Sequence, residues 1–392
     1  MFRTKLKNNK ILVYAFFQIL VLAAARNIIA PLIPIISGEF GVGLDYIGSV
    51  IALSILGLFF VSLTTGNLIE VIGLKKVLFI GLAINFTGSL MLYFSHTFSI
   101  FIIAYFLMEI GLGMLFVGNL SIVGTLYSKN KVSSLFKINF GHTSALILAP
   151  LIVGLILFIR VDCRYYYIFN LIPLVALVIV LWRMKIPRMI RVETSFRKLF
   201  SANKKIISNP AFIMCGIIIF FYTSIMNTFF VWFTSYFKNI NIDINISSLF
   251  LSLFGIAIFI GMLLRNKLIK YFKKKKILLF SFAISFLILI GVLFVNNLIA
   301  KNVLIFLFGI TIAGNFTITF SIASGLFPKY TNSASGLSFA FANLGMMTFQ
   351  YLSGYLSEYY SKNSVLYINI SILFVLIILT SFLNFHRKFD KT

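Results

Sequence analysis

Long apolar runs of 20 residues or more, separated by short charged connections, dominate this sequence of 392 residues. A helix needs roughly 20 apolar residues to cross a bilayer, whereas a strand of a membrane β-barrel needs about ten with alternating polarity. The runs are continuous and twice that length, so they predict membrane-spanning α-helices. Twelve spans are predicted, at residues 11–36, 45–70, 76–95, 98–126, 134–159, 164–184, 211–237, 247–270, 276–296, 301–326, 333–357 and 364–385.

The composition agrees with an all-α membrane protein. Hydrophobic residues make up 60% of the chain and charged residues 11%, against about a quarter charged in soluble domains. A net charge of +25 would suggest nucleic acid as the partner of a soluble protein, but here its distribution indicates topology. Apart from Arg26, the Lys and Arg residues lie at the termini and in even-numbered connections, with five exceptions: Arg160, Arg164, Lys238, Lys301 and Lys362.

This asymmetry is the positive-inside pattern, which predicts that both termini lie in the cytoplasm, here of a bacterial inner membrane. Basic clusters such as residues 273–276 are expected to rest on anionic lipid headgroups of the bilayer. We expect no nucleic-acid partner and a monomeric protein. Several acidic residues are predicted on the opposite, external side of the membrane, namely Glu39, Asp45, Asp162, Asp243 and Glu358.

The first 25 residues imitate a secretory signal peptide, with a basic start, an apolar run and alanines at 23–25. Because the apolar run continues to Ile36, it is long enough to anchor the chain, and we predict an uncleaved first span. Cys163 and Cys215 lie in different segments, as do the three histidines. These patterns favour neither a disulfide nor a metal site, and no cofactor is expected.

One long polar connection divides the chain into two halves of six spans. It reads RMKIPRMIRVETSFRKLFSANKK, between Trp182 and Pro210, and carries eight basic residues and one acid. We therefore predict an N-terminal six-helix bundle at 1–184, a basic cytoplasmic linker at 185–209 and a C-terminal six-helix bundle at 210–392.

The two halves carry a short repeat at matching positions. GNLIEVIGLKKVL (66–78) aligns without gaps to NKLIKYFKKKKIL (266–278), an offset of 200 residues. Both segments follow the second span of their half, so the alignment predicts two bundles related by pseudo-symmetry. Such bundles form the architecture of alternating access, with a substrate held between them near the midplane.

An enzyme would need a cluster of reactive side chains, and the polar residues inside the spans supply no paired acids, Cys/His set or Ser/His/Asp set. The phosphate-binding pattern G-x-x-x-x-G-K-[ST] is also absent from the sequence, so an ATP-driven mechanism is not indicated. We therefore predict a transporter and no enzyme. A duplicated membrane scaffold or receptor is the alternative outside transport.

The connection after the second span resembles that of the major facilitator superfamily, whose pattern reads roughly G-x-L-x-D-R-x-G-R-K. The resemblance extends over essentially the whole chain and implies a gating loop in which an acid and nearby lysines form a charge lock between helices. Val71 and Leu74 replace two arginines of the family pattern. A tight turn with basic topology markers is the alternative interpretation. The matching residues are Gly66, Leu68, Glu70, Gly73, Lys75 and Lys76.

The fifth span, GHTSALILAPLIVG, resembles a degenerate form of the family's antiporter motif, with Gly141, Pro150 and Gly154 kept. Small residues one turn apart allow close helix packing and the proline kinks the span, so packing alone also explains the pattern. His142, in the same span, titrates near neutral pH and is a secondary candidate for proton handling.

A third likeness, carried by GLGMLFVGN (111–119) and the segment KVSSLFKINFGHTSALILAPL, is to fucose-permease-like sugar:proton symporters. In that group an acid commonly precedes the stretch that leads to the Asn, and Phe116 stands in its place here. The likeness makes sugar symport an alternative to antiport.

Arg26 and Glu109 are the formal charges that the sequence places well inside the predicted spans. Arg26 lies 13 residues before Glu39, and Glu109 lies 13 residues after His96, which puts both about 20 Å along their helices from the outer side. A charge at the centre of a membrane helix costs about 3 kcal/mol, so each should seek the other. We predict that the two can pair.

This pair has two open interpretations. Separating the two charges would favour proton uptake by Glu109, which supplies a coupling mechanism with a single acid. Alternatively, the pair is permanent and fixes two helices. The family resemblance implies that spans 1, 4, 7 and 10 line the central cavity, which would place the pair beside the substrate path.

Further candidates for the substrate cavity come from polar and aromatic residues at helical spacing. Each of them can instead bond to a neighbouring helix. The candidates are Gln18, Tyr222, Asn227, Trp232, Thr311, Asn315, Thr319, Asn343 and Gln350.

We therefore predict a secondary active transporter that moves a small organic solute by alternating access, through proton-coupled efflux by antiport. A proton symporter for a sugar or similar nutrient, and an uncoupled facilitator, are the alternatives within transport. The expected partners are the solute, protons and the lipid bilayer.

Overall fold

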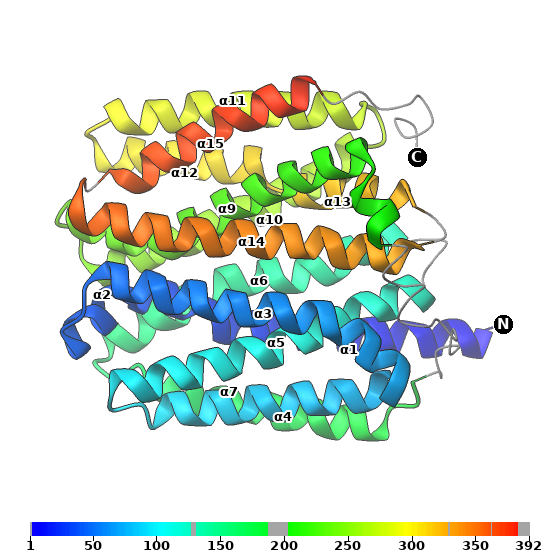
Figure 1. Ribbon diagram of the computed structural model, residues 1–392. Coiled ribbons are helices and arrows are strands. Elements are labelled where there is room, and N and C mark those ends of the chain that lie inside the picture. Colours follow the sequence, from blue (N-terminus) through cyan, green and yellow to red (C-terminus); the bar gives the residue numbers. More distant parts are fainter. Residues whose placement is uncertain (1, 127–130, 187–202, 328–329, 362, 383–392) are drawn as a thin grey trace.

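The computed structural model describes residues 2–126, 131–186, 203–327, 330–361 and 363–382, and these ranges contain helices and no strand. The helices run roughly parallel and antiparallel to one another, as Figure 1 shows. The all-α fold predicted from the apolar runs is therefore confirmed for the described residues.

The N-terminal half contains helices that match the first six predicted spans, with the first span divided in two. They are α1 (Phe2–Asn27), α2 (Ile29–Phe40), α3 (Leu44–Ile72), α4 (Leu74–Tyr93), α5 (Phe98–Leu126), α6 (Lys131–Phe158) and α7 (Tyr165–Arg183).

The C-terminal half repeats this order, and here the tenth span is divided. Its helices are α9 (Pro210–Asn239), α10 (Ile244–Leu268), α11 (Lys274–Phe294), α12 (Leu298–Ile312), α13 (Asn315–Gly325), α14 (Thr331–Tyr359) and α15 (Ser364–Ser381).

Eleven segments of the described chain are long and apolar enough to cross a membrane by length and composition. They include Lys10–Phe40, which joins α1 and α2, and Leu298–Gly325, which joins α12 and α13. The predicted span 333–357 falls on α14, a helix of 29 residues that is not among the eleven. The protein is a multi-pass integral membrane protein.

The first span is interrupted at Ile28, between α1 and α2. Pro31 has no N–H to bond to the carbonyl of Asn27, and Pro34 has none for the carbonyl of Ala30. The free Ala30 carbonyl accepts a hydrogen bond of 2.7 Å from Thr234 Oγ1 on α9. The prolines thus open an acceptor in the first half that a side chain of the second half uses.

The tenth span breaks between α12 and α13, where Ala313 is extended and Gly314 has φ +77°. Only glycine adopts this left-handed conformation without strain. The break exposes carbonyls at the end of α12, because their usual donors three and four residues onward are out of line. A buried arginine satisfies them, as described below.

The two halves lie side by side and contact each other through α3 with α14, α6 with α10, and α2 with α9. The predicted division at residues 1–184, 185–209 and 210–392 stays a proposal, since most of the linker lies outside the described residues.

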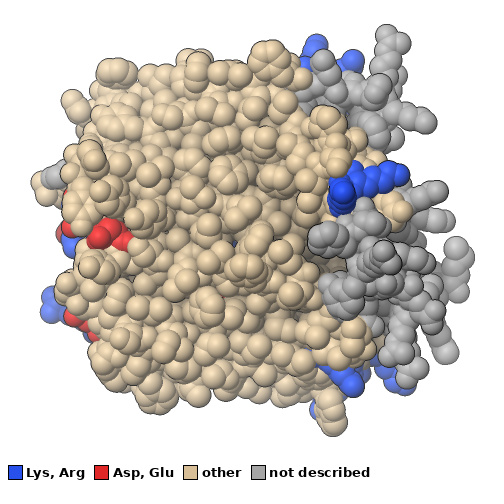
Figure 2. All heavy atoms as spheres, viewed as in Figure 1, with Lys and Arg blue, Asp and Glu red and all other residues tan. Residues whose placement is uncertain are grey.

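Charged residues separate to the two ends of the molecule. Figure 2 shows Lys and Arg at one end, the acidic residues together with some Lys and Arg at the other, and a broad uncharged band between them. We name these ends the basic face and the acidic face. The basic face includes Lys75, Lys76, Arg183, Lys267 and Lys270, and the acidic face includes Glu39, Asp45, Asp162, Asp243 and Glu358.

Near the acidic face the halves are in direct contact. The backbone N–H of Leu44 donates to Glu358 at 3.0 Å, and Tyr359 donates its hydroxyl to Asp45 at 3.2 Å. A Cβ at Gly354 would stand 2.8 Å from the carbonyl oxygen of Leu44, so α3 and α14 approach more closely than any larger residue allows. This end is therefore closed between the halves.

Candidate functional site: a cavity between the two halves

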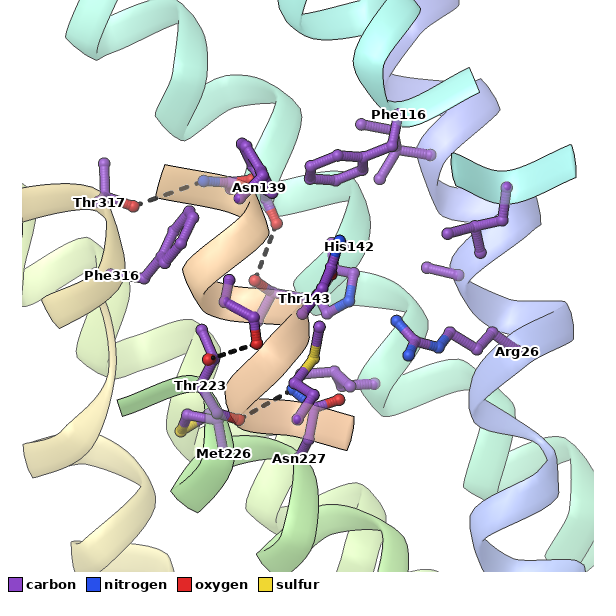
Figure 3. Close-up of a pocket in the computed structure, with 18 of the residues that line it drawn as sticks. Arg26, Phe116, Asn139, His142, Thr143, Thr223, Met226, Asn227, Phe316 and Thr317 are labelled. Atoms are coloured by element: carbon purple, nitrogen blue, oxygen red, sulfur yellow. Dashed lines mark hydrogen bonds between the residues drawn. The ribbon is translucent and has the colours of Figure 1, made fainter. Parts of the chain in front are cut away.

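A cavity of about 210 Å³ lies between the halves. Its wall comes from α1, α3, α5 and α6 of the first half and from α9, α10, α13 and α14 of the second. Most of the wall is apolar, and polar groups project into it at a small number of positions (Figure 3). An apolar cavity with a few convergent polar groups is the usual form of a small-molecule site.

Arg26 and Glu109 form an ion pair on the wall of this cavity, with Arg26 Nε 2.9 Å from Glu109 Oε1. The Arg26 side chain is 14% exposed and Glu109 is fully buried, so the acid lies behind the arginine as seen from the cavity. Figure 3 shows the guanidinium pointing from α1 toward His142 on α6. Two helices of the first half thus present one cation to the cavity, backed by a hidden acid.

Amide and hydroxyl groups occupy the opposite wall. Asn227 Nδ2 donates to the carbonyl of Thr223 at 3.1 Å, and Thr223 Oγ1 donates to the carbonyl of Ala342 at 3.0 Å. Asn343 lines the cavity and is 2% exposed, and its Nδ2 has no hydrogen-bond partner among the described residues. Asn139 Nδ2 reaches Thr317 Oγ1 at 3.4 Å and links the halves. Uncharged donors therefore predominate here.

Phenylalanines of both halves meet at the end of the cavity that lies toward the basic face. Phe116 on α5 packs edge-on against Phe339 on α14, with ring centroids 5.0 Å apart. Phe339 also contacts Phe316 and Phe320 of α13, at 5.5 and 5.3 Å. Phe116, at the position where the likeness to sugar symporters predicts an acid, is thus part of an aromatic cluster that joins the two halves.

Three of the nine residues predicted for the substrate cavity line it, namely Tyr222, Asn227 and Asn343. The other six do not line it in this structure, and a role for them in the substrate path stays a prediction. They are Gln18, Trp232, Thr311, Asn315, Thr319 and Gln350.

The prediction for α12 and α13 assumed one continuous helix, in which residues four apart share a face. The break at Gly314 removes that register. Thr311 Oγ1 lies 2.8 Å from Ser285 Oγ, and Asn315 Nδ2 donates to Ser281 at 2.7 Å, so both point into the second half. Thr319 donates to the carbonyl of Asn315 at 3.0 Å and is buried.

The remaining three residues pack between helices. Gln18 Nε2 donates to the hydroxyl of Tyr14 at 3.1 Å. Trp232 is fully buried at the contact of α3 with α14, where a Cβ at Gly354 would stand 3.1 Å from its ring. Gln350 is fully buried on α14. Burial between helices keeps these three side chains off the cavity wall, and the amide of Gln350 and Nε1 of Trp232 have no hydrogen-bond partner among the described residues.

The predicted gating loop is a tight turn between α3 and α4, with Gly73 at φ +91°. Lys75 Nζ donates to the carbonyls of Trp182 and Met184, at 2.8 and 3.0 Å, and so attaches this turn to the end of α7. Lys76 is exposed, and Gly66 has open space around its Cα. The side chain of Glu70 lies outside the described part, so the charge lock stays a prediction.

The motif of the fifth span lies on α6, where its small residues contact other helices. A Cβ at Gly141 would stand 2.6 Å from the carbonyl oxygen of Phe16 on α1. Gly154 and Pro150 are buried, and Gly154 has wider spacing, with Asn245 of α10 at 3.8 Å. Packing thus explains Gly141 directly. His142 also lines the cavity, a place that its sequence context did not indicate.

Arg265 is a buried charge that sequence reasoning missed, because it was assigned to the basic end of the predicted span 247–270. It is 6% exposed and donates to the carbonyls of Thr311 at 2.6 Å and Ala313 at 3.1 Å. It also donates to Ser281 Oγ at 3.0 Å. The guanidinium therefore caps the end of α12. The Gly-Asn pair at 314–315 was the available sequence signal of a helix break.

Solved structures of transporters share this fold. FucP, a Major Facilitator Superfamily transporter solved in the outward conformation, is similar with a TM-score of 0.72 and 15% identity, over 96% of this chain and 99% of that one. A D-xylose-proton symporter is similar with a TM-score of 0.77 and 13% identity, over 97% and 98% of the two chains. At these identities the likeness shows the fold.

A relative in sequence is "Protein TsgA homolog" of Buchnera aphidicola subsp. Baizongia pistaciae (strain Bp), 28% identical over 221 residues. The match covers 55% of this chain and 54% of that protein, so it spans about half of the relative. The family profile described as Major Facilitator Superfamily matches residues 15–337, most of the chain. With twelve predicted spans, a duplicated helical architecture and a central cavity, the chain belongs to the major facilitator superfamily of transporters and is not an enzyme.

Proposed function

We propose that this protein is a proton-coupled secondary transporter that moves a small organic solute by alternating access. The observation that carries the proposal is the ion pair of Arg26 with Glu109, at 2.9 Å on the cavity wall. Among the described side chains, Glu109 is the one buried acid. A buried carboxylate beside a cavity is the group expected to carry a proton through a membrane.

The coupling follows from the position of the two charges. Arg26 at 2.9 Å favours the anionic form of Glu109 and offsets part of the cost of burying its charge. When a solute or a helix movement draws the guanidinium away, an unpaired buried carboxylate is left, and proton uptake removes its cost. Binding of the solute at Arg26 is thereby linked to proton uptake by Glu109, and release of the solute to proton release. Permanent fixing of α1 to α5 is the competing role.

The direction of proton movement relative to the solute has two candidates. The likeness of the fifth span to the antiporter motif supports efflux by antiport, and we retain it as the direction proposed from sequence. Symport is the second candidate, favoured by the charge of the cavity wall. Arg26 faces the cavity and none of the described wall residues is an acid, so an anionic solute would bind there together with a proton.

The orientation follows from the charged ends. We propose that the basic face lies in the cytoplasm of a bacterial inner membrane, against anionic headgroups, and that the protein acts as a monomer. The turn at Gly73 with Lys75 and Lys76, together with Glu70, would then form a cytoplasmic gating loop.

Proteoliposomes that contain a pH-sensitive dye test the proposal. Sugars, amino acids, small organic acids and small organic cations are added one at a time under an imposed pH gradient, and internal pH and solute content are read together. Opposite flux of solute and proton supports antiport, and parallel flux supports symport. Solute movement that is indifferent to the gradient refutes the coupling, and a receptor or scaffold would move no solute.

Substitutions at the pair identify the coupling residue. Glu109→Gln should abolish gradient-driven accumulation and leave exchange of solute for solute, because exchange needs no net proton movement. The double variant Arg26→Gln with Glu109→Gln removes both charges and controls for an unpaired buried cation. Lys267→Gln removes an exposed cation outside the cavity and should transport normally. Intact accumulation by Glu109→Gln would show that another group carries the proton.

A further inference from the structure

We infer that the solute is a small organic monoanion, a carboxylate on a compact apolar body. This inference rests on the proposed function, since it names the class of solute that the same cavity would carry. Three observations lead to it: the charge of the cavity wall, an unsatisfied amide donor on it, and its size and apolarity.

The charge of the wall favours an anion. Arg26 is the one charged side chain among the described wall residues, and its partner Glu109 is fully buried behind it. Arg26 contacts Glu109 through Nε, and its guanidinium points into the cavity toward His142, where a ligand can reach it. The forked donors of arginine match the two oxygens of a carboxylate. A cationic solute would instead meet the guanidinium first and be repelled.

The polar groups across the cavity complete a site for acceptor oxygens. Asn343 Nδ2 is buried without a hydrogen-bond partner among the described residues, and a buried donor of this kind costs stability until an acceptor meets it. Asn227 adds a second amide to the wall, whose Nδ2 donates one N–H to the carbonyl of Thr223 at 3.1 Å and keeps the other. A carboxylate supplies acceptors only, which is the complement of these donors.

The rest of the cavity limits the body of the solute. Its volume of about 210 Å³ lies below the roughly 300 Å³ at which pockets for drug-sized molecules begin. Most of the surface is apolar and offers no partners for a ring of hydroxyl groups. A polyhydroxylated sugar is therefore a poor fit. The apolar wall residues include Ile19, Leu22, Leu112, Ile258, Met346 and Phe316.

Binding of such an anion at Arg26 would lead to proton uptake by Glu109. The solute carboxylate competes with Glu109 for Arg26, and the displaced Glu109 takes a proton from water to become neutral. One solute charge and one proton then enter together, without net charge, which is the stoichiometry of symport. The titratable groups around this pair are Tyr105 on α5, His142 on α6 and Tyr167 on α7.

Three probes matched in size test the inference on the full chain in detergent: benzoate, benzamide and benzylammonium. Their affinities are measured by titration calorimetry, and proton uptake is measured with a pH indicator in weakly buffered solution. We expect benzoate to bind about tenfold or more tightly than either of the others. We also expect about one proton to be taken up with each benzoate.

Variants separate the two charges. Glu109→Gln should bind benzoate at least as tightly and take up no proton, because Arg26 no longer has a competing acid. The double variant Arg26→Gln with Glu109→Gln should lose the preference for benzoate over benzamide, and Arg26→Lys should keep part of it. Lys267→Gln, an exposed cation outside the cavity, should match the unmodified protein.

Equal or tighter binding of benzamide or benzylammonium would overturn the inference, as would a benzoate preference that survives in the double variant. Proton uptake that persists in Glu109→Gln would overturn the coupling to Glu109 and assign it to His142. Benzoate binding without proton-coupled flux in proteoliposomes would leave the inferred class standing and refute the proposed function. Coupled flux of a neutral solute, with no benzoate binding, would support the proposed function and refute the inferred class of solute.

Discussion

Thr234 donates a hydrogen bond of 2.7 Å to the carbonyl oxygen of Ala30, across the boundary between the two halves of the protein. The carbonyl is available because Pro34, four residues later, has no N–H to offer it. Both residues are buried. This hydrogen bond joins α2 to α9 beside the acidic face, and opening of that face would break it.

The first prediction is that Thr234→Val favours opening of the acidic face. Valine keeps the shape of threonine and loses the hydroxyl, which is worth about 0.5–1.5 kcal/mol, so the ratio of open to closed protein should rise roughly 2- to 13-fold. Spin labels at the exposed positions 46 and 360, in a cysteine-free background, report the separation of the halves. Thr234→Ser retains the donor and is the control. An unchanged distance distribution in Thr234→Val would contradict the prediction.

A second prediction concerns Gly354, whose added Cβ would stand 2.8 Å from the Leu44 carbonyl oxygen. Gly354→Ala should push α3 away from α14 and speed hydrogen exchange of the amides at 44–50, measured by mass spectrometry. Gly336→Ala lies on the same helix with nothing within 4 Å and should leave that exchange unchanged. Equal exchange in both variants would show that the close approach of α3 and α14 does not hold the face closed.

The third prediction is that Arg265 stabilises the broken tenth span. Arg265→Met leaves the carbonyls of Thr311 and Ala313 without the guanidinium, which should lower the free energy of unfolding by about 2–4 kcal/mol. The loss of stability in Arg265→Lys should be smaller than in Arg265→Met, because one ammonium group replaces only part of the donors of the guanidinium. Thermal unfolding in detergent measures the loss, with Lys267→Gln as the exposed control. Equal stability of Arg265→Met and Lys267→Gln would refute this role.

Cys163 supplies a fourth prediction, on pH dependence. It lies between α6 and α7, where burial, with the charge of Asp162 as a lesser cause, raises the pKa of its thiol to about 11. The thiolate is the reactive form, so alkylation by iodoacetamide should be slow at pH 7 and rise about tenfold per pH unit up to about 11. Asp162→Asn should speed the reaction at a given pH, and Cys163→Ser should abolish this component. A rate that levels off near pH 9 would contradict the raised pKa.

The membrane spans could be predicted from sequence because the bilayer imposes a length on every apolar helix, whatever its neighbours are. The same reasoning placed Arg26 and Glu109 at equal depth, since both could be counted from the outer ends of their spans. Depth says nothing about which side of a helix faces which neighbour. The contact at 2.9 Å required the packing of α1 against α5.

Arg265 and the two divided spans could not be placed correctly by counting residues along a continuous helix. Thr311, Asn315 and Thr319 share a face only if the helix is continuous, and Gly314 ends that continuity. Arg265 lies near the end of its predicted span, where a basic residue indicates the cytoplasmic side of the membrane. Its hydrogen-bond partners are instead the carbonyls of residues 46 and 48 positions later in the chain.

The sequence by itself determined the all-α membrane fold and the position of most apolar spans, and it predicted the two halves and the separation of charge to two faces. These depend on transfer from water to lipid, which is a property of each segment alone. The tertiary structure decided which polar groups meet in the cavity, which pair between helices and how the halves meet at the acidic face. Those outcomes depend on the rotation and close approach of helices from distant parts of the chain, as Gly354 against Leu44 and Thr234 against Ala30 demonstrate.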